Sequence, residues 1–159
     1  LIIALRPFKA GDYIEAAGTA GSVDSVQIFA TTLKTPDNKV VIVPNSAILG
    51  SNIVNYSRMP TRRIDLIIGV SYAANLAQTK ALIEEIVKAN SDVLAEPEPL
   101  VAVAELADSS VNLVVRPWVK SVDYWAVRFQ FLRRVKETFD QQGIEIPFPQ
   151  RVVHMMPEA

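Results

Sequence analysis

The stretch from Gly21 to Tyr56 constrains the fold of this chain more than any other part of the sequence. Apolar runs in it alternate with short polar turns, which is the pattern of consecutive β-strands. The run Val40–Val43 consists of β-branched residues only, and this predicts a strand covered on both faces. Pro44 cannot donate a hydrogen bond to a neighbouring strand, so we expect the strand to end there. Asn45 then stands where its side chain can cap a short helical turn that Gly50 closes.

Further strands are expected on both sides of that run, throughout residues 13–58. One begins at Tyr13, residues 23–35 are long enough for a bent strand or two, and another covers residues 53–56. Residues 36–38 read Pro-Asp-Asn and predict a turn, because proline fixes φ while Asp and Asn tolerate left-handed geometry. About five short strands with one helical turn predict a small, strongly bent Sm-like β-barrel domain over residues 13–58.

The periodicity changes after residues 58–63, which we interpret as a linker. Residues 59–146 are expected to form a second domain in the order β-α-β-β-α, with strands at 64–72, 100–106 and 111–119 and helices at 76–89 and from about Ser121 to Gly143. The expected buried positions are Leu76, Leu82, Ile83, Ile86 and Val87 in the first helix, and Val127, Leu132, Val135 and Phe139 in the second. Residues 144–146 are a possible last strand. This order predicts a ferredoxin-like α+β domain.

Both ends of the chain differ from these two domains. Leu1–Leu5 are all apolar and are followed by Arg6, Pro7 and Lys9, so residues 1–12 read as the end of a longer helix and a connector. The two cations would then lie just inside a membrane. A short amphipathic start to a soluble protein is the alternative interpretation. Residues 147–159 begin with Pro-Phe-Pro and form a tail with a short strand-like piece, which several subunits could combine into a shared β-barrel.

Composition and motifs exclude several classes of function. The formal net charge is −1, which gives no support for the basic stripe of a nucleic-acid-binding protein. The chain has no cysteine, so disulfides and thiolate metal sites are excluded. Gly-rich phosphate loops, nucleophile elbows and His-Glu metalloprotease helices are absent, and we therefore predict no enzyme, no cofactor and no metal site. The single histidine, His154, cannot form a catalytic triad or a metal site by itself.

Motifs spread along the whole chain resemble the small-conductance mechanosensitive channel (MscS-like) family. Residues 6–13 (RPFKAGDY) resemble the segment that leaves the family's pore-lining helix and enters its β domain. The pieces of that domain's signature are Gly21-Ser22-Val23, Val26-Gln27-Ile28-Phe29, Thr31-Thr32 and Val43-Pro44-Asn45. Residues 53–58 fit the end of the domain, residues 60–63 the link to the family's α/β domain, and residues 143–150 its last turn and tail.

The resemblance implies an architecture and a function. Subunits of the family form a homoheptamer around one pore in the bacterial inner membrane, and their cytoplasmic parts form a hollow cage with lateral portals. This chain would be the cage portion of a tension-gated channel that releases ions and small solutes on hypo-osmotic shock. The transmembrane helices, and through them the contact with the lipid bilayer, would precede Leu1. Residues 151–156 would supply one strand of a distal barrel.

Three groups of residues are candidate sites under this interpretation. Arg62, Arg63 and Asp65 would line the portals, where a ring of charges tunes ion preference; a solvated charge pair without a role is the alternative. Arg6 and Lys9 would lie near the membrane and contact anionic headgroups, or only mark topology. Val152, His154 and Met156 would belong to the oligomer barrel, in which a ring of histidines would be sensitive to pH.

Two other functions remain open at the level of sequence. A ring-forming Sm-like module that binds nucleic acid would share the barrel, but it needs a basic face that the net charge does not indicate. A soluble, ferredoxin-like module that senses a ligand is the second alternative, and stabilisation by a metabolite would favour it. Neither explains the apolar start, the Pro44-Asn45 pair or the proline-rich tail.

Overall fold

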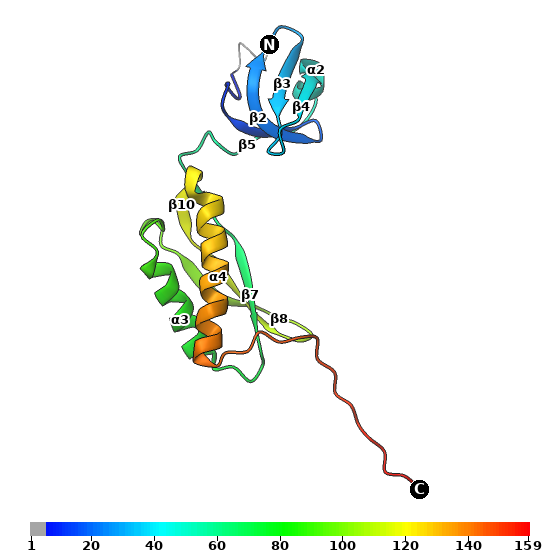
Figure 1. The fold of residues 1–159 in the computed structure, drawn as a ribbon, viewed down its shortest axis with the longest axis vertical. Coiled ribbons are helices and arrows are strands. Elements are labelled where there is room, and N and C mark those ends of the chain that lie inside the picture. Colours follow the sequence, from blue (N-terminus) through cyan, green and yellow to red (C-terminus); the bar gives the residue numbers. More distant parts are fainter. Residues whose placement is uncertain (1–5) are drawn as a thin grey trace. The chain divides into compact units, whose positions relative to one another are not determined.

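The structure is a computed structural model that describes residues 6–159. The chain folds as two units that divide between Pro60 and Thr61, and each has its own hydrophobic core (Figure 1). Leu1–Leu5, which the sequence assigned to the end of a pore-lining helix, lie outside the described residues.

The first unit is a five-stranded antiparallel sheet in the order β4-β3-β2-β1-β5. Its elements are β1 (Tyr13–Ala16), β2 (Thr19–Val26), β3 (Ala30–Lys34), β4 (Val40–Pro44), α2 (Asn45–Leu49) and β5 (Val54–Asn55). The strand-rich prediction with a single helical turn is therefore confirmed, as is the turn after β3, where Asn38 has a φ of 69°. The sheet bends around a core of Phe8, Ile14, Ala16, Val23, Leu33, Val43 and Ile48.

One expectation for β4 was wrong, because this strand is buried on one face only. Val43 is buried, whereas Val40 and Ile42 are each 68% exposed. β4 is an edge strand of the sheet, so its outward face has no neighbouring layer in this unit. A run of β-branched residues therefore reflects here a strand with an apolar outer face, and not a strand in the middle of a parallel sheet.

The predicted capping role of Asn45 was also wrong. Pro44 occupies the N-cap position of α2, and no side chain caps this helix. The Asn45 side chain instead turns into the unit, where it accepts a hydrogen bond from Thr31 Oγ1 at 2.8 Å. Its amide Nδ2 donates to the carbonyls of Gln27 and Ile28. A buried amide with three partners lowers the free energy of the fold more than an exposed cap would.

The second unit has a three-stranded antiparallel sheet in the order β7-β9-β8, and helices α3 and α4 cover one of its faces (Figure 1). Its elements are β6 (Thr61–Arg63), β7 (Leu66–Val70), α3 (Leu76–Ala89), β8 (Leu100–Leu106), β9 (Val111–Arg116), β10 (Trp118–Lys120), the 3₁₀ turn η1 (Ser121–Asp123) and α4 (Tyr124–Gln142). The predicted order β-α-β-β-α is confirmed, and the predicted bounds of α3 and β8 match the observed ones.

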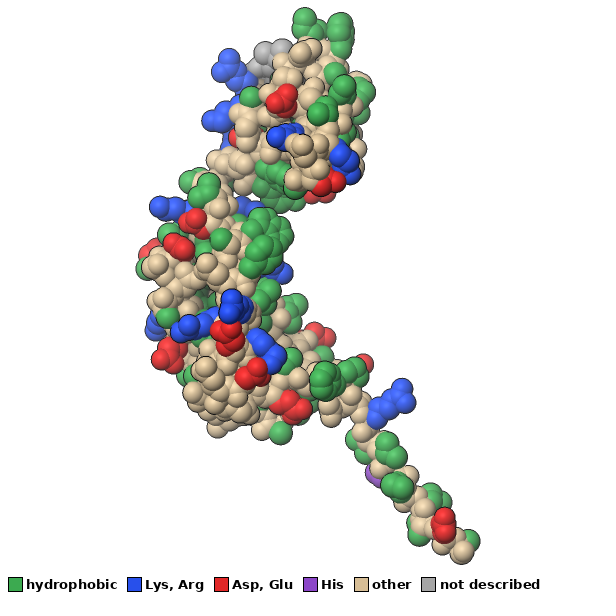
Figure 2. Space-filling model, viewed as in Figure 1, with side chains coloured by type: hydrophobic (Ala, Val, Ile, Leu, Met, Phe, Trp, Pro, Cys, Tyr) green, Lys and Arg blue, Asp and Glu red, His purple; other side chains and the backbone are tan. Residues whose placement is uncertain are grey.

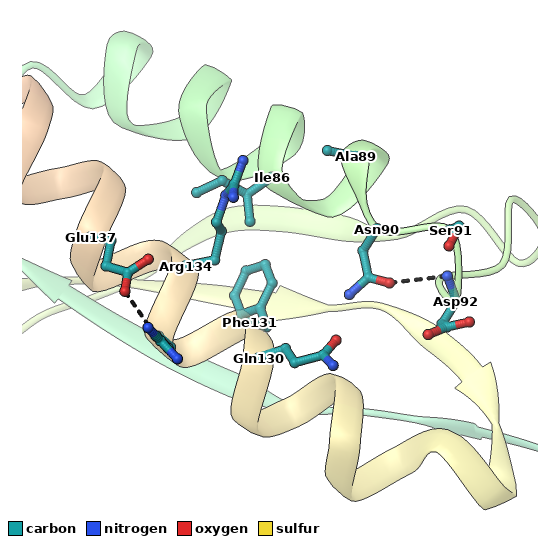
Figure 3. Close-up of a pocket in the computed structure, with 10 residues that line it drawn as sticks. Ile86, Ala89, Asn90, Ser91, Asp92, Gln130, Phe131, Arg134 and Glu137 are labelled. Carbon is teal, nitrogen blue, oxygen red and sulfur yellow. Dashed lines mark hydrogen bonds and ion pairs between the residues drawn. The ribbon is translucent and has the colours of Figure 1, made fainter.

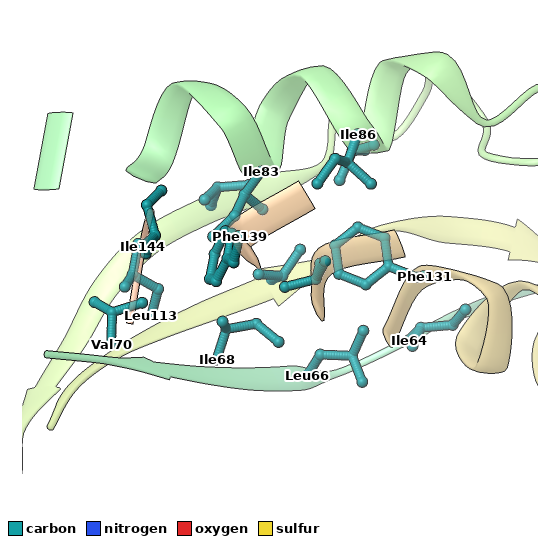
Figure 4. Packing of buried hydrophobic residues seen from close by; sticks show 14 of the residues in the cluster. Ile64, Leu66, Ile68, Val70, Ile83, Ile86, Leu113, Phe131, Phe139 and Ile144 are labelled. Carbon is teal, nitrogen blue, oxygen red and sulfur yellow. The ribbon is translucent and has the colours of Figure 1, made fainter. Parts of the chain in front are cut away.

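The core of this unit forms between the sheet and the two helices (Figure 4). Alternate residues of β7 and β9 point into it, as expected for a sheet with one covered face. Helix α3 contributes Ile83, Ile86 and Val87, and α4 contributes Val127, Phe131, Val135 and Phe139. The stripe expected for α3 was wrong at Leu76, which is 37% exposed, and Leu82 is only partly buried. The stripe expected for α4 was correct except at Leu132, which is exposed while its neighbour Phe131 is buried.

The strand expected over residues 111–119 is divided at Pro117 into β9 and β10, and two other segments of the second unit also differ from the sequence-based expectation. Thr61–Arg63 were predicted to be a linker, but they form β6 and pair with β10. Residues 144–146 were a possible last strand but form none; the Ser71 amide donates to the Glu145 carbonyl, and the ladder goes no further. Pro147 and Pro149 follow directly and carry no N–H to donate, which explains the missing fourth strand of the ferredoxin-like sheet.

The tail, residues 147–159, contains no helix or strand, and it is exposed from Phe148 onward. The Gln150 amide donates a hydrogen bond to Ser109 Oγ of the second unit. The expected barrel strand depends on several subunits, and it stays a prediction about the assembly.

Candidate functional site

Two buried side chains, Phe8 and Asp12, hold the connector into the first unit, residues 6–12. Phe8 packs in the core of the unit, so the chain is anchored two residues after Arg6. Asp12 is buried, and its Oδ2 accepts hydrogen bonds from the Lys9 amide at 3.1 Å and from Asn55 Nδ2 at 2.9 Å. The connector is therefore fixed on the first unit at Phe8 and at Asp12.

Asn55, in the last strand of the unit, ties the beginning of the domain to its end. Its Nδ2 also donates to the Pro7 carbonyl, while its Oδ1 accepts from the amides of Ser57 and Arg58. Each polar atom of this side chain has a partner, as a part-buried amide requires. We call Phe8, Asp12 and Asn55 the connector clamp. Sequence reasoning missed Asp12 and Asn55, since only the pairing of β1 with β5 brings these distant residues together.

The two membrane-proximal candidates, Arg6 and Lys9, are both exposed at this connector. A cavity of about 330 Å³ opens beside them, and Arg58 lies on its wall as well. Arg6 has a φ of 46°, so the chain turns sharply as it enters the unit. The three cations give this end of the unit a positive surface, which is suited to anions such as lipid phosphates.

The portal candidates lie at the start of the second unit. Arg62 stacks on Tyr124 of α4, with its guanidinium carbon 3.9 Å from the ring centroid. Arg63 and Asp65 form a bidentate ion pair, with Nε to Oδ1 at 2.6 Å and Nη2 to Oδ2 at 3.0 Å. The hydrogen bond to Asp65, followed by its charge, raises the pKa of Arg63. Arg128 of α4 donates to the Asp65 carbonyl and fixes the backbone at this corner.

The structure thus brings Arg63 and Asp65 into contact, while Arg62 turns to the aromatic side chain of α4. The candidates in the tail are not gathered in the single chain: Val152, His154 and Met156 are exposed on an extended segment.

A polar groove of about 440 Å³ lies between the end of α3 and the middle of α4 (Figure 3). Arg133 pairs with Glu137 at 2.8 Å on one side, and Asn90 accepts a hydrogen bond from the Asp92 amide on the other. The ion pair raises the pKa of Arg133. Exposed pairs one helical turn apart are common on solvated helices, and nothing in the groove points to a reaction.

Residues 6–159 contain no group of three His, Cys, Asp or Glu side chains placed to hold a metal ion. None of the helices in this part of the chain is both long enough and apolar enough to cross a membrane.

Comparison with protein-family models matches both units. Residues 1–58 match the model described as "Mechanosensitive ion channel, beta-domain", and residues 64–146 match "Mechanosensitive ion channel MscS, C-terminal". Both models describe parts of ion channels and not of enzymes, which agrees with the prediction that the chain is not an enzyme.

Individual relatives give the same result. The chain is 44% identical to an uncharacterized MscS family protein of Synechocystis over 98% of this chain and 53% of the relative. It is also 44% identical to the small-conductance mechanosensitive channel of Edwardsiella ictaluri, over 98% of this chain and 54% of the channel. The chain therefore spans about half the length of these curated relatives.

A solved structure supports the fold over almost the whole chain. The crystal structure of Helicobacter pylori MscS in its closed state matches with a TM-score of 0.92 and 29% sequence identity, over 99% of this chain and 62% of that one. Two family models in sequence order, a shared fold and close relatives lead to one conclusion. The chain belongs to the MscS family of mechanosensitive ion channels.

Proposed function

We propose that this chain is the cytoplasmic cage portion of a small-conductance mechanosensitive channel, which opens under membrane tension and releases ions and small solutes during hypo-osmotic shock. The observation that carries the proposal is the 44% identity to the Edwardsiella ictaluri channel over 98% of this chain. The protein would assemble as a homoheptamer in the bacterial inner membrane. Residues 13–58 and 59–146 would form the cytoplasmic domains, and residues 1–12 would connect these domains to the pore helix.

In this function, the connector clamp would couple movements of the pore helix to the β domain. Tension acts on the area of the protein within the bilayer, so it is sensed outside residues 6–159. A contact that differs between the closed and open states shifts their populations by its difference in free energy. With Phe8 buried and Asp12 bound to Asn55, movement of the preceding segment is coupled to the β domain. The cage thus modulates gating.

Recording from the full-length protein in liposomes under graded suction tests the proposed function. We expect openings whose probability rises with tension. If protein that is shown to be inserted and assembled gives no openings up to membrane rupture, the channel function is excluded. The assignment of the fold would not be affected.

We further propose that Arg62, Arg63 and Asp65 line the portals, and that Arg6 and Lys9 lie next to the membrane. Asp65→Asn removes one negative charge from each subunit, so the reversal potential in a salt gradient should shift towards anion preference. Glu137→Gln is the matched control, because Glu137 also forms an exposed ion pair with an arginine. Equal reversal potentials for the two variants would place Asp65 away from the ion path.

For the membrane-proximal pair, Arg6→Gln with Lys9→Gln should weaken the dependence of gating on anionic lipid. Lys39→Gln, an exposed lysine in the turn before β4, serves as the control. If all variants respond equally to added anionic lipid, Arg6 and Lys9 only mark topology.

A further inference from the structure

The groove between the end of α3 and the middle of α4 has an apolar floor and charged side chains at its rim. Ile86 and Phe131 form the floor, and both belong to the core of the second unit. The volume of about 440 Å³ is enough for a small organic molecule. Pockets that bind such molecules usually combine apolar walls with a few polar groups that fix the orientation of the ligand. We call this pocket the α3–α4 groove.

Four charged side chains line the α3–α4 groove, and two of them pair with each other. Arg133 Nε lies 2.8 Å from Glu137 Oε1, and Figure 2 shows oppositely charged side chains next to one another over α4. The other two are Arg134 and Asp92, whose side chains form no hydrogen bond or ion pair within residues 6–159. The groove therefore keeps one positive and one negative side chain that are available to a ligand.

These two available charges lie at opposite ends of the groove. In Figure 3, Arg134 reaches from α4 to Ile86, whereas Asp92 lies beyond Asn90, where α3 has ended. Ile86 and Asn90 are four residues apart, so the two ends are separated by about one helical turn, or about 5.4 Å. The carbonyls at the end of α3 add partial negative charge on the side of Asp92. One end of the groove is therefore suited to an anion and the other to a cation.

Hydrogen bonds of Asn90 order the backbone at the acidic end. Asn90 Oδ1 accepts from the Asp92 amide at 3.0 Å, and the Asn90 carbonyl accepts from the Val93 amide at 3.1 Å. The chain therefore turns tightly after α3, and the position of Asp92 relative to the helix is fixed. A site that is ordered before it binds loses less conformational entropy on binding, which favours a ligand.

A small zwitterion with an apolar spacer matches all of these features. We propose that the α3–α4 groove binds an ω-amino carboxylate, with its carboxylate on Arg134 and its ammonium on Asp92. Its methylene groups would lie on Ile86 and Phe131, and a chain of about three of them spans about one helical turn. The site lies within the second unit, so it does not depend on whether the protein conducts ions.

Saturation-transfer NMR on the full-length protein in detergent tests the proposal, with γ-aminobutyrate as the probe. Titration gives its dissociation constant, which is compared with those of butyrate, butylamine and glycine. Butyrate lacks the ammonium, butylamine lacks the carboxylate, and glycine carries its two charges too close together to reach both ends. We expect γ-aminobutyrate to bind at least about tenfold more tightly than each of the three. The proposal is overturned if γ-aminobutyrate does not bind, or if it binds no more tightly than the other compounds.

Substitutions at the two ends locate the bound probe. Arg134→Gln and Asp92→Asn should each raise the dissociation constant of γ-aminobutyrate about tenfold, because each removes the charge that binds one end of the ligand. Lys136→Gln and Asp140→Asn are the matched controls, since these residues form an exposed ion pair on α4 and do not line the groove. Both controls should bind the probe as the unchanged protein does. If either Arg134→Gln or Asp92→Asn binds as tightly as its control, the groove does not hold both charges of the ligand, and the proposal is wrong.

Discussion

At the scale of single residues, the first unit depends on one buried amide. Asn45 accepts a hydrogen bond from Thr31 and donates to two carbonyls of the turn before β3, although the turn and α2 are separated in sequence by all of β3 and β4. Such a side chain links two elements that the backbone ladder does not join. Its removal leaves several buried polar groups without a partner, and this costs more than the loss of an exposed hydrogen bond.

We therefore predict that Asn45→Ala lowers the free energy of unfolding of the first unit by about 1–3 kcal/mol. Hydrogen exchange of peptides covering residues 23–50 measures the change without interference from the second unit. Ser46→Ala, one residue further along the helix, should change the free energy of unfolding by less than about 0.5 kcal/mol. If the two variants exchange equally fast, water replaces Asn45 as the hydrogen-bond partner of the groups that it leaves, and the buried network makes no net contribution to the free energy of unfolding.

Gly143 is a second residue with a definite energetic role. It follows α4 with a φ of 71°, and the next amide, Ile144 N–H, bonds back to the Phe139 carbonyl. Ile144 and Phe139 belong to the same core, which completes the usual hydrophobic contact of this helix ending.

Gly143→Ala should lower the free energy of unfolding of the second unit by about 1 kcal/mol, because a Cβ is disfavoured at this φ. No atom lies within 4 Å of the added Cβ, so the effect is conformational and not a clash. Gly143→Asn should cost less, since Asn tolerates left-handed geometry. Urea unfolding followed by tryptophan fluorescence is the measurement, because both tryptophans, Trp118 and Trp125, lie in this unit. Equal losses for Ala and Asn would contradict the conformational explanation.

At the scale of elements, local patterns predicted most of the secondary structure. Helix α3 and strand β8 were predicted with their observed bounds because apolar periodicity and proline or glycine punctuation are local signals. The errors occurred where tertiary pairing decides. Thr61–Arg63 look like a linker and become a strand only because β10 lies beside them, and residues 144–146 remain without a ladder because prolines follow.

The two faces of β4 differ in burial, and one substitution on each face tests what this difference contributes to stability. Val43 is buried and Ile42 is 68% exposed on the same strand. We expect Val43→Ala to cost about 2 kcal/mol of unfolding free energy, from roughly 0.8 kcal/mol per buried carbon plus the cavity. Ile42→Ala removes more carbon atoms but should cost less than about 0.5 kcal/mol in the isolated 159-residue chain. Hydrogen exchange of the first unit measures both.

A large loss in the Ile42 variant would mean that the outer face of β4 is covered after all, by another copy of the chain. The measurement should then depend on protein concentration, which a monomer would not show.

At the scale of the whole molecule, the sequence predicted two folding units in the right order, but it placed the candidate site only in part. Arg6, Lys9 and the pair Arg63–Asp65 were named as candidates from their charge and from the family resemblance; the structure shows the ion pair, and the roles of all four residues stay predictions. The connector clamp was not named, because Asp12 and Asn55 come together only through the pairing of β1 with β5. Charge patterns are local and readable, whereas a buried pair distant in sequence has no local signal.

The tail tests how folding and assembly are divided along the chain. Residues 148–159 are exposed and carry no strand, so a chain that ends after Pro147 should unfold at the same urea concentration, by tryptophan fluorescence, as the complete one. Ending the chain after Gly143 also removes buried Ile144 and should cost about 1.5–3 kcal/mol. In the full-length protein, the truncation after Pro147 should weaken the oligomer, which sedimentation in detergent measures, because each subunit loses its strand of the proposed distal barrel. An oligomer of undiminished stability would mean that Val152, His154 and Met156 contribute nothing to assembly, and that the subunits are held together by surfaces within the two folded units and by the segments that precede them.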